Sequence, residues 1–339
     1  MPKRDIIVVG ASAGGVEALK YLVKQLPSEL NAAILVVLHF PSDGTSVLPQ
    51  ILNRAKGLPV SHAKNGEVLV PRRIYVAPPD YHLLVKAGYI TLVRGPRENS
   101  HRPAIDPLFR TAALACRERV IGVVLTGVLD DGTAGLKAVK QLGGVAVVQD
   151  PEDAMYPGMP RSAIENVDNI DYILPLAEIP NVLVNLVDMS ATAEDDNDCP
   201  KGKEVPILPD IEYESNIAEL DTTALGQEDK PGIASHYSCP DCGGNLWELQ
   251  EADLLRFRCR IGHAFSVESL IAKQSHALED ALWVALRALE EKSSLARRMA
   301  LRMRERNYNL SAERFEAEAQ KAEENATLIR NVLLDDSSD

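Results

Sequence analysis

The stretch Ile6-Ile7-Val8-Val9-Gly10-Ala11-Ser12-Ala13-Gly14-Gly15 decides how the first half of this chain is expected to fold. Its four leading apolar residues predict a buried strand, and the helical pattern after the glycines predicts a sharp strand-to-helix turn. Such a turn can present a serine hydroxyl as a nucleophile, and the helix start offers N–H groups to a developing oxyanion. The same glycines also suit a turn that only joins two elements or that cradles a phosphate.

Apolar runs and helical patterns alternate along residues 1–188. Strands are predicted at Ile6–Val9, Ala33–Leu38, Arg73–Ala77, Val120–Thr126, Val145–Gln149 and Tyr172–Leu174. Helices are predicted at about Gly14–Gln25, Ser46–Ala55, Pro107–Ala115, Thr133–Leu142 and Leu176–Val187. A hairpin is predicted from His82–Val85 and Tyr89–Val93. Nearly continuous apolar strands with helices between them predict an α/β fold, doubly wound around a mostly parallel, Rossmann-like sheet.

Length and charge indicate more than one domain. The 339 residues predict two or three units. The net charge is −13, but much of it is local, because twelve Asp and Glu stand against three Lys and Arg between Met189 and Ser235. With its prolines and glycines, this stretch predicts a flexible acidic linker over 189–234. The remainder is only mildly acidic, so the charge gives no reason to expect a nucleic-acid partner.

Signals for export or membrane insertion are missing from the sequence. No apolar run approaches the roughly 20 residues that cross a membrane, and the amino terminus has no signal-peptide core. A cytoplasmic protein without membrane insertion is therefore expected. The five cysteines of such a protein indicate reduced thiols or metal ligands and not a disulfide framework.

Three kinds of reactive side chain follow predicted strands. Ser12 follows the first strand, His39 ends the second, and Asp130 and Asp131 come shortly after Val120–Thr126. Because the carboxyl ends of parallel strands meet at one edge of a sheet, these groups are expected to lie together. A serine needs a neighbouring base, a histidine can relay its proton, and a carboxylate fixes the histidine tautomer. Together they predict a serine hydrolase, although each residue taken singly also suits packing, a loop or a helix cap.

Seven short motifs along the first segment carry a family resemblance. They are Val9-Gly10-Ala11-Ser12-Ala13-Gly14-Gly15, Leu38-His39-Phe40-Pro41, Tyr75-Val76-Ala77-Pro78-Pro79-Asp80-Tyr81-His82, His101-Arg102-Pro103-Ala104-Ile105-Asp106, Leu125-Thr126-Gly127, Asp131-Gly132 and Tyr156-Pro157-Gly158-Met159-Pro160-Arg161. With these motifs, residues 5 to about 188 resemble the catalytic domain of the chemotaxis receptor methylesterases, also called protein-glutamate methylesterases.

The resemblance implies a function and a set of catalytic residues. It implies a triad of Ser12, His39 and Asp131 that needs no cofactor for catalysis. It also implies hydrolysis of γ-glutamyl methyl esters on the cytoplasmic helices of methyl-accepting chemoreceptors, and many members of the family deamidate receptor glutamines as well. The expected protein is therefore an enzyme of bacterial chemotaxis and signal transduction.

Two departures from the family pattern affect what is expected. The family loop before the aspartate usually reads Gly-Met-Gly-x-Asp-Gly, whereas Val128 and Leu129 stand here, and Leu129 lacks the backbone freedom of glycine. The resemblance selects Asp131 as catalytic and leaves Asp130 as a solvated loop residue. The family usually carries an amino-terminal receiver domain that is not expected here. Control is then expected from the carboxyl-terminal half or a regulatory signalling protein, unless the activity is constitutive.

Further motif residues are candidates for the site. The N–H of Ala13 is a candidate donor to the oxyanion. A set of loop residues is expected to line the mouth of the site, namely His101, Arg102, Asp106, Met159 and Arg161. Arg161 suits neutralisation of a carboxylate product or of an acidic receptor surface. Hydrogen bonding within loops and at helix caps is the alternative role for these residues.

A cysteine–histidine cluster follows the acidic stretch. Cys239 and Cys242 form a C-x2-C pair, and Cys259 with His263 forms a C-x3-H pair. Thiolates and an imidazole suit tetrahedral zinc, and four protein ligands leave no open position, so a structural zinc ion is predicted. His236 is an alternative fourth ligand, and a redox C-x2-C pair or an unliganded cluster is an alternative to zinc.

The last part of the chain is predicted to hold two modules. Residues 235–272 predict a small zinc-ribbon-like module, and residues 273–339 predict a helical hairpin and tail. Apolar residues recur there at helical spacing, at Leu278, Leu282, Ala285, Leu286, Leu289, Phe315, Ala319, Ala322, Ala326, Ile329 and Leu333. A cluster of arginines suits either docking to an acidic surface or the solvated face of a self-contained hairpin. Its members are Arg297, Arg298, Arg302, Arg304 and Arg306.

Two alternatives to a chemoreceptor esterase remain open. The same chemistry can act on a protein outside chemotaxis. The glycine-rich turn can also bind a phosphate or nucleotide without catalysis. This second alternative lacks part of its pattern, because Ser12 occupies the second glycine place of G-x-G-x-x-G and no P-loop lysine follows.

Overall fold

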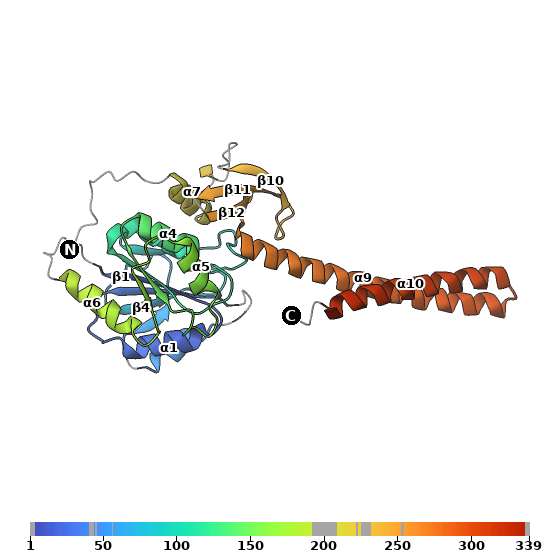
Figure 1. Cartoon of the computed structure of the whole chain (residues 1–339), viewed down its shortest axis with the longest axis horizontal. Helices are drawn as coiled ribbons and strands as arrows, with labels where there is room; N and C mark the ends of the chain where they lie inside the picture. Colours follow the sequence, from blue (N-terminus) through green and yellow to red (C-terminus); the bar gives the residue numbers. More distant parts are fainter. Residues whose placement is uncertain are drawn as a thin grey trace. The chain divides into compact units, whose positions relative to one another are not determined.

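The computed structural model describes residues 4–40, 44, 46–55, 57–191, 209–221, 223–224, 232–251 and 254–335. Much of the predicted linker, at 192–208 and 225–231, therefore lies outside the described residues. The chain divides into two compact units, Met1–Leu270 and Ile271–Asp339. Figure 1 shows the elements of both units.

A seven-stranded parallel sheet forms the centre of the first unit, in the order β3-β4-β2-β1-β7-β8-β9. Its strands are β1 (Ile6–Ala11), β2 (Ala33–Leu38), β3 (Val60–His62), β4 (Arg73–Val76), β7 (Val120–Val124), β8 (Val145–Gln149) and β9 (Tyr172–Leu174). This confirms the predicted doubly wound α/β fold. The strand order reverses at β1, so the ends of β2, β1 and β7 form the crevice where such sheets bind ligands.

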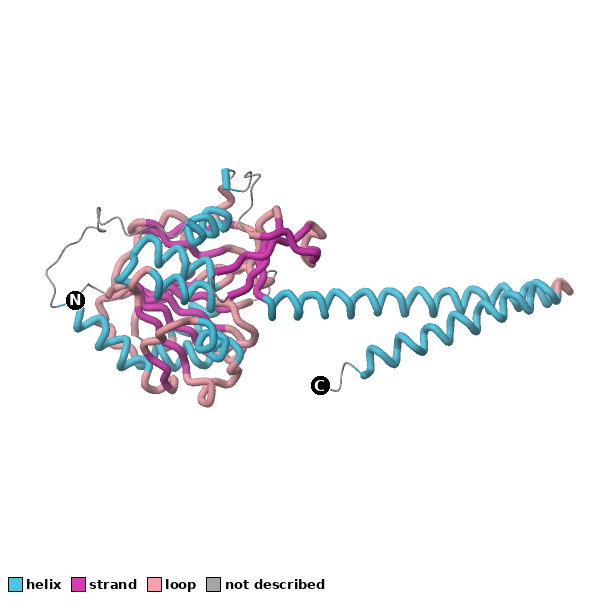
Figure 2. Tube along the Cα trace, turned by 45° about the horizontal axis from the view of Figure 1, so that its top comes forward, coloured by secondary structure: helices cyan, strands magenta, loops and turns pink. Residues whose placement is uncertain are grey.

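Helices cover both faces of this sheet, as Figure 2 shows. Those of one face are α1 (Gly15–Gln25), α2 (Leu48–Asn53) and α6 (Ile179–Ala191); those of the other are α3 (Ile105–Cys116), α4 (Thr133–Gln141) and α5 (Gly158–Asn166). Each strand feeds both cores by alternation, since Val8 packs toward α3 while Ile7 and Val9 pack toward α1.

The structure adds elements to those predicted and confirms the hairpin. β5 (His82–Lys86) pairs antiparallel with β6 (Tyr89–Val93). The short strand β3 and the helix α5 had no predicted counterpart. A 3-10 turn, Arg117–Arg119, follows α3.

A four-stranded antiparallel sheet follows later in the first unit. Its order is β10 (Ile233–Ser238), β11 (Asn245–Glu251), β12 (Leu254–Cys259) and β13 (Ala264–Ser266). We call these strands, the turns between them and the following residues up to Leu270 the Cys/His module. Its own core is small and consists of Cys239, Leu246, Phe257, Cys259, Phe265 and Leu270.

Helix α7 (Pro209–Ala218) corrects the expectation of a solvated linker over part of 189–234. Ile211 joins the core beside α3, and Ile217 and Ala218 are buried. The carboxylate of Glu214 is also buried, because arginines from other elements neutralise it. The high acidic content therefore did not prevent this part of the stretch from packing.

Buried ion pairs explain why the first unit extends to Leu270 although the sequence suggested separate segments. Arg256 and Arg258 of β12 contact the carboxylate of Glu214, and Arg258 also reaches Glu98. Glu98 in turn pairs with Arg110 of α3 at 2.7 Å. These ion pairs connect three parts of the first unit: helix α3 on the central sheet, helix α7, and the Cys/His module.

The second unit is an antiparallel pair of helices. α9 (Val267–Glu305) begins just before this unit, and α10 (Asn309–Asp335) returns alongside it. Small side chains such as Ala300 and Ala319 are buried between them, and Arg297 and Arg304 pair with glutamates of α10. Within the described ranges, no helix is both long enough and apolar enough to cross a membrane.

Candidate active site

Three loops meet at the carboxyl edge of the sheet, and each follows one of its central strands. Ser12 comes directly after β1, His39 directly after β2, and Asp131 lies between β7 and α4. Since β1 is hydrogen-bonded to both β2 and β7, the ends of the three strands are neighbours. The structure thus brings together the three side chains that the sequence singled out.

His39 lies between the other two residues. Its Nδ1 is 3.1 Å from Ser12 Oγ, and its Nε2 is 2.7 Å from Asp131 Oδ2. An ionised carboxylate only accepts hydrogen bonds, so Nε2 carries the proton and Nδ1 is left to accept from the serine hydroxyl. This chain of hydrogen bonds has the arrangement that activates a serine as a nucleophile.

The carboxylate of Asp131 is fully enclosed by donors. The N–H of Ile105, at the start of α3, donates to Oδ2 at 2.7 Å, and Asn99 Nδ2 donates to Oδ1 at 2.9 Å. Burial acts to raise the pKa of Asp131, but the hydrogen bond and charge of His39 and the Ile105 N–H outweigh it and hold this pKa well below its usual range. Asp131 is therefore an anion that faces His39.

A second buried carboxyl group, Asp106, lies next to Asp131. It accepts hydrogen bonds from the N–H groups of Gly132 and Gly135 and from Asn99 Nδ2. Burial and the negative charge of Asp131 raise the pKa of Asp106 to about 8. The two neighbouring carboxyl groups thus have pKa values that are pushed apart, as is usual for like charges in one buried site.

The turn that carries Ser12 is fixed from the β7 side. The Ser12 N–H donates to the Thr126 carbonyl at 3.0 Å, and Thr126 Oγ1 donates to the Ala13 carbonyl at 3.0 Å. Gly14 adopts a φ of 72°, which glycine allows at little cost. Among the described residues, no acceptor takes a hydrogen bond from the Ala13 N–H.

The first half of the chain matches known proteins over the region that builds this site. A family model described as CheB methylesterase matches residues 7–183, more than half of the chain. The chain belongs to the CheB methylesterase family. This confirms the predicted family resemblance and the predicted class of enzyme, a methylesterase.

Individual relatives agree with this membership. The chain is 40% identical to a Leptospira interrogans protein over 183 residues, 54% of this chain and 94% of that protein. It is 37% identical over 193 residues to a Pyrococcus horikoshii protein named protein-glutamate methylesterase/protein-glutamine glutaminase, 56% of this chain and 52% of that protein. The crystal structure of the Thermotoga maritima CheB methylesterase catalytic domain matches with a TM-score of 0.53 and 37% identity, covering 55% of this chain and all of that domain.

Gly127 lies close to both Ser12 and Met159. A Cβ atom at this position would lie 2.1 Å from Met159 Sδ and 2.9 Å from Ser12 Cβ. We expect Gly127→Ala to displace Ser12 or Met159 and to lower kcat about 10²-fold, because misplacement of a reacting group by 1 Å has effects of that order.

Steady-state kinetics on an ester substrate test this expectation. The control is Gly57→Ala, where a Cβ would meet nothing closer than 3.5 Å. If Gly127→Ala retained wild-type kcat, Gly127 would not be needed to place the serine.

The other candidate residues of this CheB-family site divide into two groups. The His101 ring stacks on that of His39, with centroids 3.6 Å apart, and Met159 is fully buried against Gly127. Arg102 instead bonds to Asp80 and to the Gly95 carbonyl. Arg161 is exposed and lies 3.6 Å from Glu152. The structure thus places His101 against His39 and Met159 against Gly127, and it gives Arg102 and Arg161 other partners.

The loop before Asp131 has two special residues, Leu129 and Asp130. Leu129 adopts a φ of 58°, so the backbone keeps a left-handed conformation without a glycine. Asp130 is not solvated as expected but buried, and its Oδ1 accepts a hydrogen bond of 2.6 Å from Ser266 Oγ. Burial raises the pKa of Asp130 to about 6.

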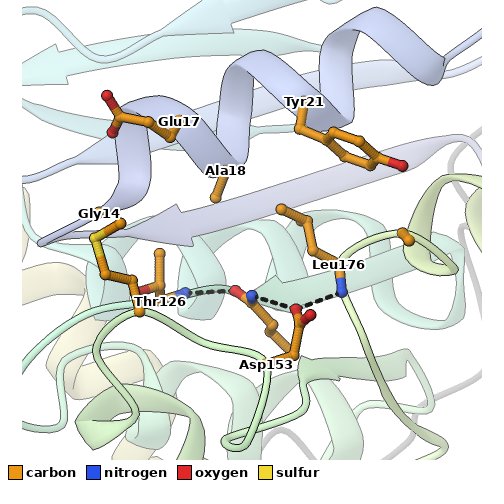
Figure 3. Close-up of a pocket in the computed structure, with 10 residues that line it drawn as sticks. Gly14, Glu17, Ala18, Tyr21, Thr126, Asp153 and Leu176 are labelled. Atoms are coloured by element: carbon orange, nitrogen blue, oxygen red, sulfur yellow. Dashed lines mark hydrogen bonds between the residues drawn. The ribbon is translucent and has the colours of Figure 1, made fainter.

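A pocket of about 400 Å³ adjoins the serine turn through Gly14 and Thr126. Figure 3 shows Glu17, Ala18 and Tyr21 on one side and Asp153 on the other. Asp153 is held in place, because its Oδ2 accepts from Gln149 Nε2 and from the Leu176 N–H, both at 2.8 Å. The lining thus includes two carboxylates and an aromatic ring, and it reaches the serine turn at Gly14.

The predicted cysteine–histidine ligands come together in the Cys/His module. The ligand atoms of Cys239, Cys242, Cys259 and His263 all lie within 4.8 Å of one another. Cys242 Sγ is 3.7 Å from Cys259 Sγ, and His263 Nδ1 is 3.6 Å from Cys259 Sγ. Tetrahedral zinc puts neighbouring sulfur and nitrogen ligands roughly 3.5–3.8 Å apart, so this cluster can hold a metal ion. His236 does not take part in it.

Sequence reasoning missed Asn99. Its side chain bridges Asp131 and Asp106, yet it stands in a short polar loop with no recognisable motif. Its backbone φ of 50° is the one local sign of a special role, and that sign is visible only in the structure.

Proposed function

We propose that this chain hydrolyses methyl esters of glutamyl side chains on the cytoplasmic helices of chemoreceptors, and that it deamidates glutamines at such positions. The observation that carries the proposal is the continuous hydrogen-bond chain from Ser12 through His39 to Asp131. It lies within the part of the chain that matches the CheB methylesterase family. The name of the Pyrococcus relative includes both a glutamate methylesterase and a glutamine glutaminase activity. This name supports the proposal that the chain cleaves glutamyl methyl esters and glutamine amides.

The proposed mechanism begins with the serine hydroxyl. His39 Nδ1 takes the proton of Ser12 Oγ while this oxygen attacks the ester carbonyl carbon. Asp131 keeps Nε2 protonated and stabilises the imidazolium that forms. The carbonyl oxygen becomes an oxyanion within reach of the Ala13 N–H.

The second half of the proposed cycle releases both products. The imidazolium of His39 gives its proton to the leaving methoxide, which departs as methanol and leaves an acyl-enzyme on Ser12. Water, deprotonated by His39, then attacks the acyl carbon and frees the glutamate carboxylate and the serine. For a glutamine side chain the same steps release ammonia in place of methanol.

Exposed apolar side chains next to the serine turn support a helical protein substrate. Val128, Met155 and Tyr156 are 48%, 67% and 42% exposed. They are close to the nucleophile in the fold, since the Gly127 N–H donates to the Tyr156 carbonyl and Met155 packs at Gly14. Such a rim suits the apolar stripe of an amphipathic receptor helix.

Methanol release from methylated receptor fragments tests this proposal. We expect the full chain to release methanol from a chemoreceptor cytoplasmic fragment methylated at glutamates, and Ser12→Ala to release none above background. Release from other methylated proteins but not from receptor fragments would favour the same chemistry outside chemotaxis. Tight nucleotide binding in calorimetry without esterase activity would overturn the proposal in favour of a phosphate-binding turn.

We further propose that the Cys/His module holds a structural zinc ion. Two backbone turns present the ligands, since Gly243 N–H donates to the Cys239 carbonyl and Gly262 N–H donates to the Cys259 carbonyl. The ion would stabilise a module whose own apolar core is small.

A further inference from the structure

We propose that the Cys/His module, with a metal ion at its four ligands, positions the esterase triad through the amide of Asn99. This inference rests on the proposed esterase function. It assigns a role to a part of the chain that lies outside the residues matched by the family model, 7–183. It also makes the proposed metal ion a determinant of activity although the ion takes no part in the reaction.

Strand β13 of the module lies directly against the loop that carries Asn99. The Asn99 N–H donates to the Ala264 carbonyl at 2.8 Å, and the Ala264 N–H donates to the Arg97 carbonyl at 3.1 Å. Glu98 and Ala264 form a parallel β-bridge. The loop therefore extends the sheet of the module by a short strand-like segment.

The module also fixes the side chain of Asn99. Asn99 Oδ1 accepts hydrogen bonds from the Ser266 N–H at 3.0 Å and from Ser269 Oγ at 3.1 Å. With its oxygen held in this way, the Nδ2 group points to the carboxylates of Asp131 and Asp106. The opposite amide orientation would set an oxygen against the Asp131 carboxylate, so the two serine donors decide which group Asp131 meets.

One amide thus connects the module to the catalytic carboxylate. Asn99 Nδ2 holds Asp131 Oδ1, which leaves Oδ2 for His39 Nε2 at 2.7 Å. The neighbouring Asp130 is held in the same way, because Ser266 Oγ donates to its Oδ1. Both aspartates of the loop after β7 therefore depend on residues at the end of the module.

The candidate metal site adjoins the same strand. His263 immediately precedes β13, and its carbonyl accepts the Cys259 N–H at 2.9 Å. Arg258, next to Cys259, reaches Glu98, the neighbour of Asn99. A metal ion that holds Cys259 and His263 therefore holds both ends of the turn that leads into Ala264 and Ser266.

A series of variants tests the path through Asn99. We expect Asn99→Ala to lower kcat about 10- to 100-fold, the usual effect of losing one hydrogen bond to a buried charge, with KM little changed. Ser269→Ala removes one of the two orienting donors and should lower kcat less, while Ser269→Thr, which retains the hydroxyl, should restore it. His236→Ala, in the module but outside the ligand cluster, is the matched control.

Active-site titration separates positioning from folding. A fluorophosphonate that labels Ser12 counts the folded sites, and kcat is expressed per labelled site. A merely structural role would lower the number of sites and the melting temperature but leave kcat per site unchanged. Ser269→Ala keeps the test decisive if Asn99→Ala does not fold.

Removal of the metal tests the other end of the path. We expect a chelator to withdraw one zinc ion per chain, measured by atomic absorption, to lower the melting temperature, and to lower kcat per site. Zn²⁺ should restore all three and Mg²⁺ should not. In Asn99→Ala the chelator should still withdraw zinc and lower the melting temperature but should no longer change kcat per site.

Each outcome decides a separate point. An inactive wild type would end the proposed function itself. An active wild type whose kcat per site is insensitive to Asn99→Ala and Ser269→Ala would overturn the inference alone. The inference is also overturned if zinc is not bound, or if its removal lowers kcat equally in wild type and Asn99→Ala.

Discussion

Ser12→Ala is expected to lower methanol release at least about 10⁴-fold, because the variant has no nucleophile while His39 and Asp131 remain in place. The fold should survive, since Ser12 makes its structural contacts through the backbone, with its N–H on the Thr126 carbonyl and its carbonyl on the Gly15 N–H. The rate is measured as methanol released per folded chain, and an unchanged melting temperature confirms the folded state.

His39→Ala serves as the comparison for this first expectation. Loss of general-base catalysis alone costs roughly 10²–10⁴-fold. Residues of one triad act as a unit, so the double variant of Ser12 and His39 should be hardly slower than Ser12→Ala. If the rate loss of the double variant equalled the product of the two single rate losses, the two side chains would not act together.

Glu214→Gln is expected to destabilise the first unit by about 3–5 kcal/mol, because it removes a buried charge that faces arginines and leaves them uncompensated. Glu214 Oε2 lies 2.6 Å from Arg256 Nη1, and its Oε1 lies 2.7 Å from Arg258 Nε. The melting temperature should fall on the order of 10 °C. Glu212→Gln is the matched control on the same helix, since Glu212 is exposed, and its effect should stay within about 0.5 kcal/mol.

The lowered pKa of Glu214 predicts the direction in which the stability of the first unit changes with pH. Burial acts to raise the pKa of Glu214, but Arg256 and Arg258 outweigh it and lower this pKa far below its ordinary value of 4.5. A lowered pKa in the folded state adds stability that is present above the unfolded value and is lost as the pH falls through the folded one. Wild type should therefore lose melting temperature below about pH 5 more steeply than Glu214→Gln. If the melting temperatures of wild type and Glu214→Gln fell equally steeply below about pH 5, this would contradict the assigned role of Glu214.

The central site could be predicted because its signals are local. The apolar runs of β1, β2 and β7 mark buried parallel strands, and Ser12, His39 and Asp131 stand where such strands end. Simple topology then brings the three residues to one edge. The cysteine–histidine spacing was equally local, and the four ligands lie together.

The parts that could not be predicted depend on partners distant in the sequence. Glu214 was counted with a solvated acidic stretch, because its arginine partner Arg258 stands 44 residues further along. The contact of Asn99 with Ser266 spans 167 residues and has no pattern of its own. Helix α5 carries Gly158 and Pro160, which weakened its helical signal.

Covalent labelling of Ser12 tests the central claim most directly. A fluorophosphonate reacts with a serine only when a neighbouring base activates it, and peptide mass spectrometry then locates the adduct. We expect one adduct per chain, on Ser12, formed quickly in wild type, slowly in His39→Ala and not at all in Ser12→Ala. Labelling at another serine, or equal rates in wild type and His39→Ala, would contradict the triad.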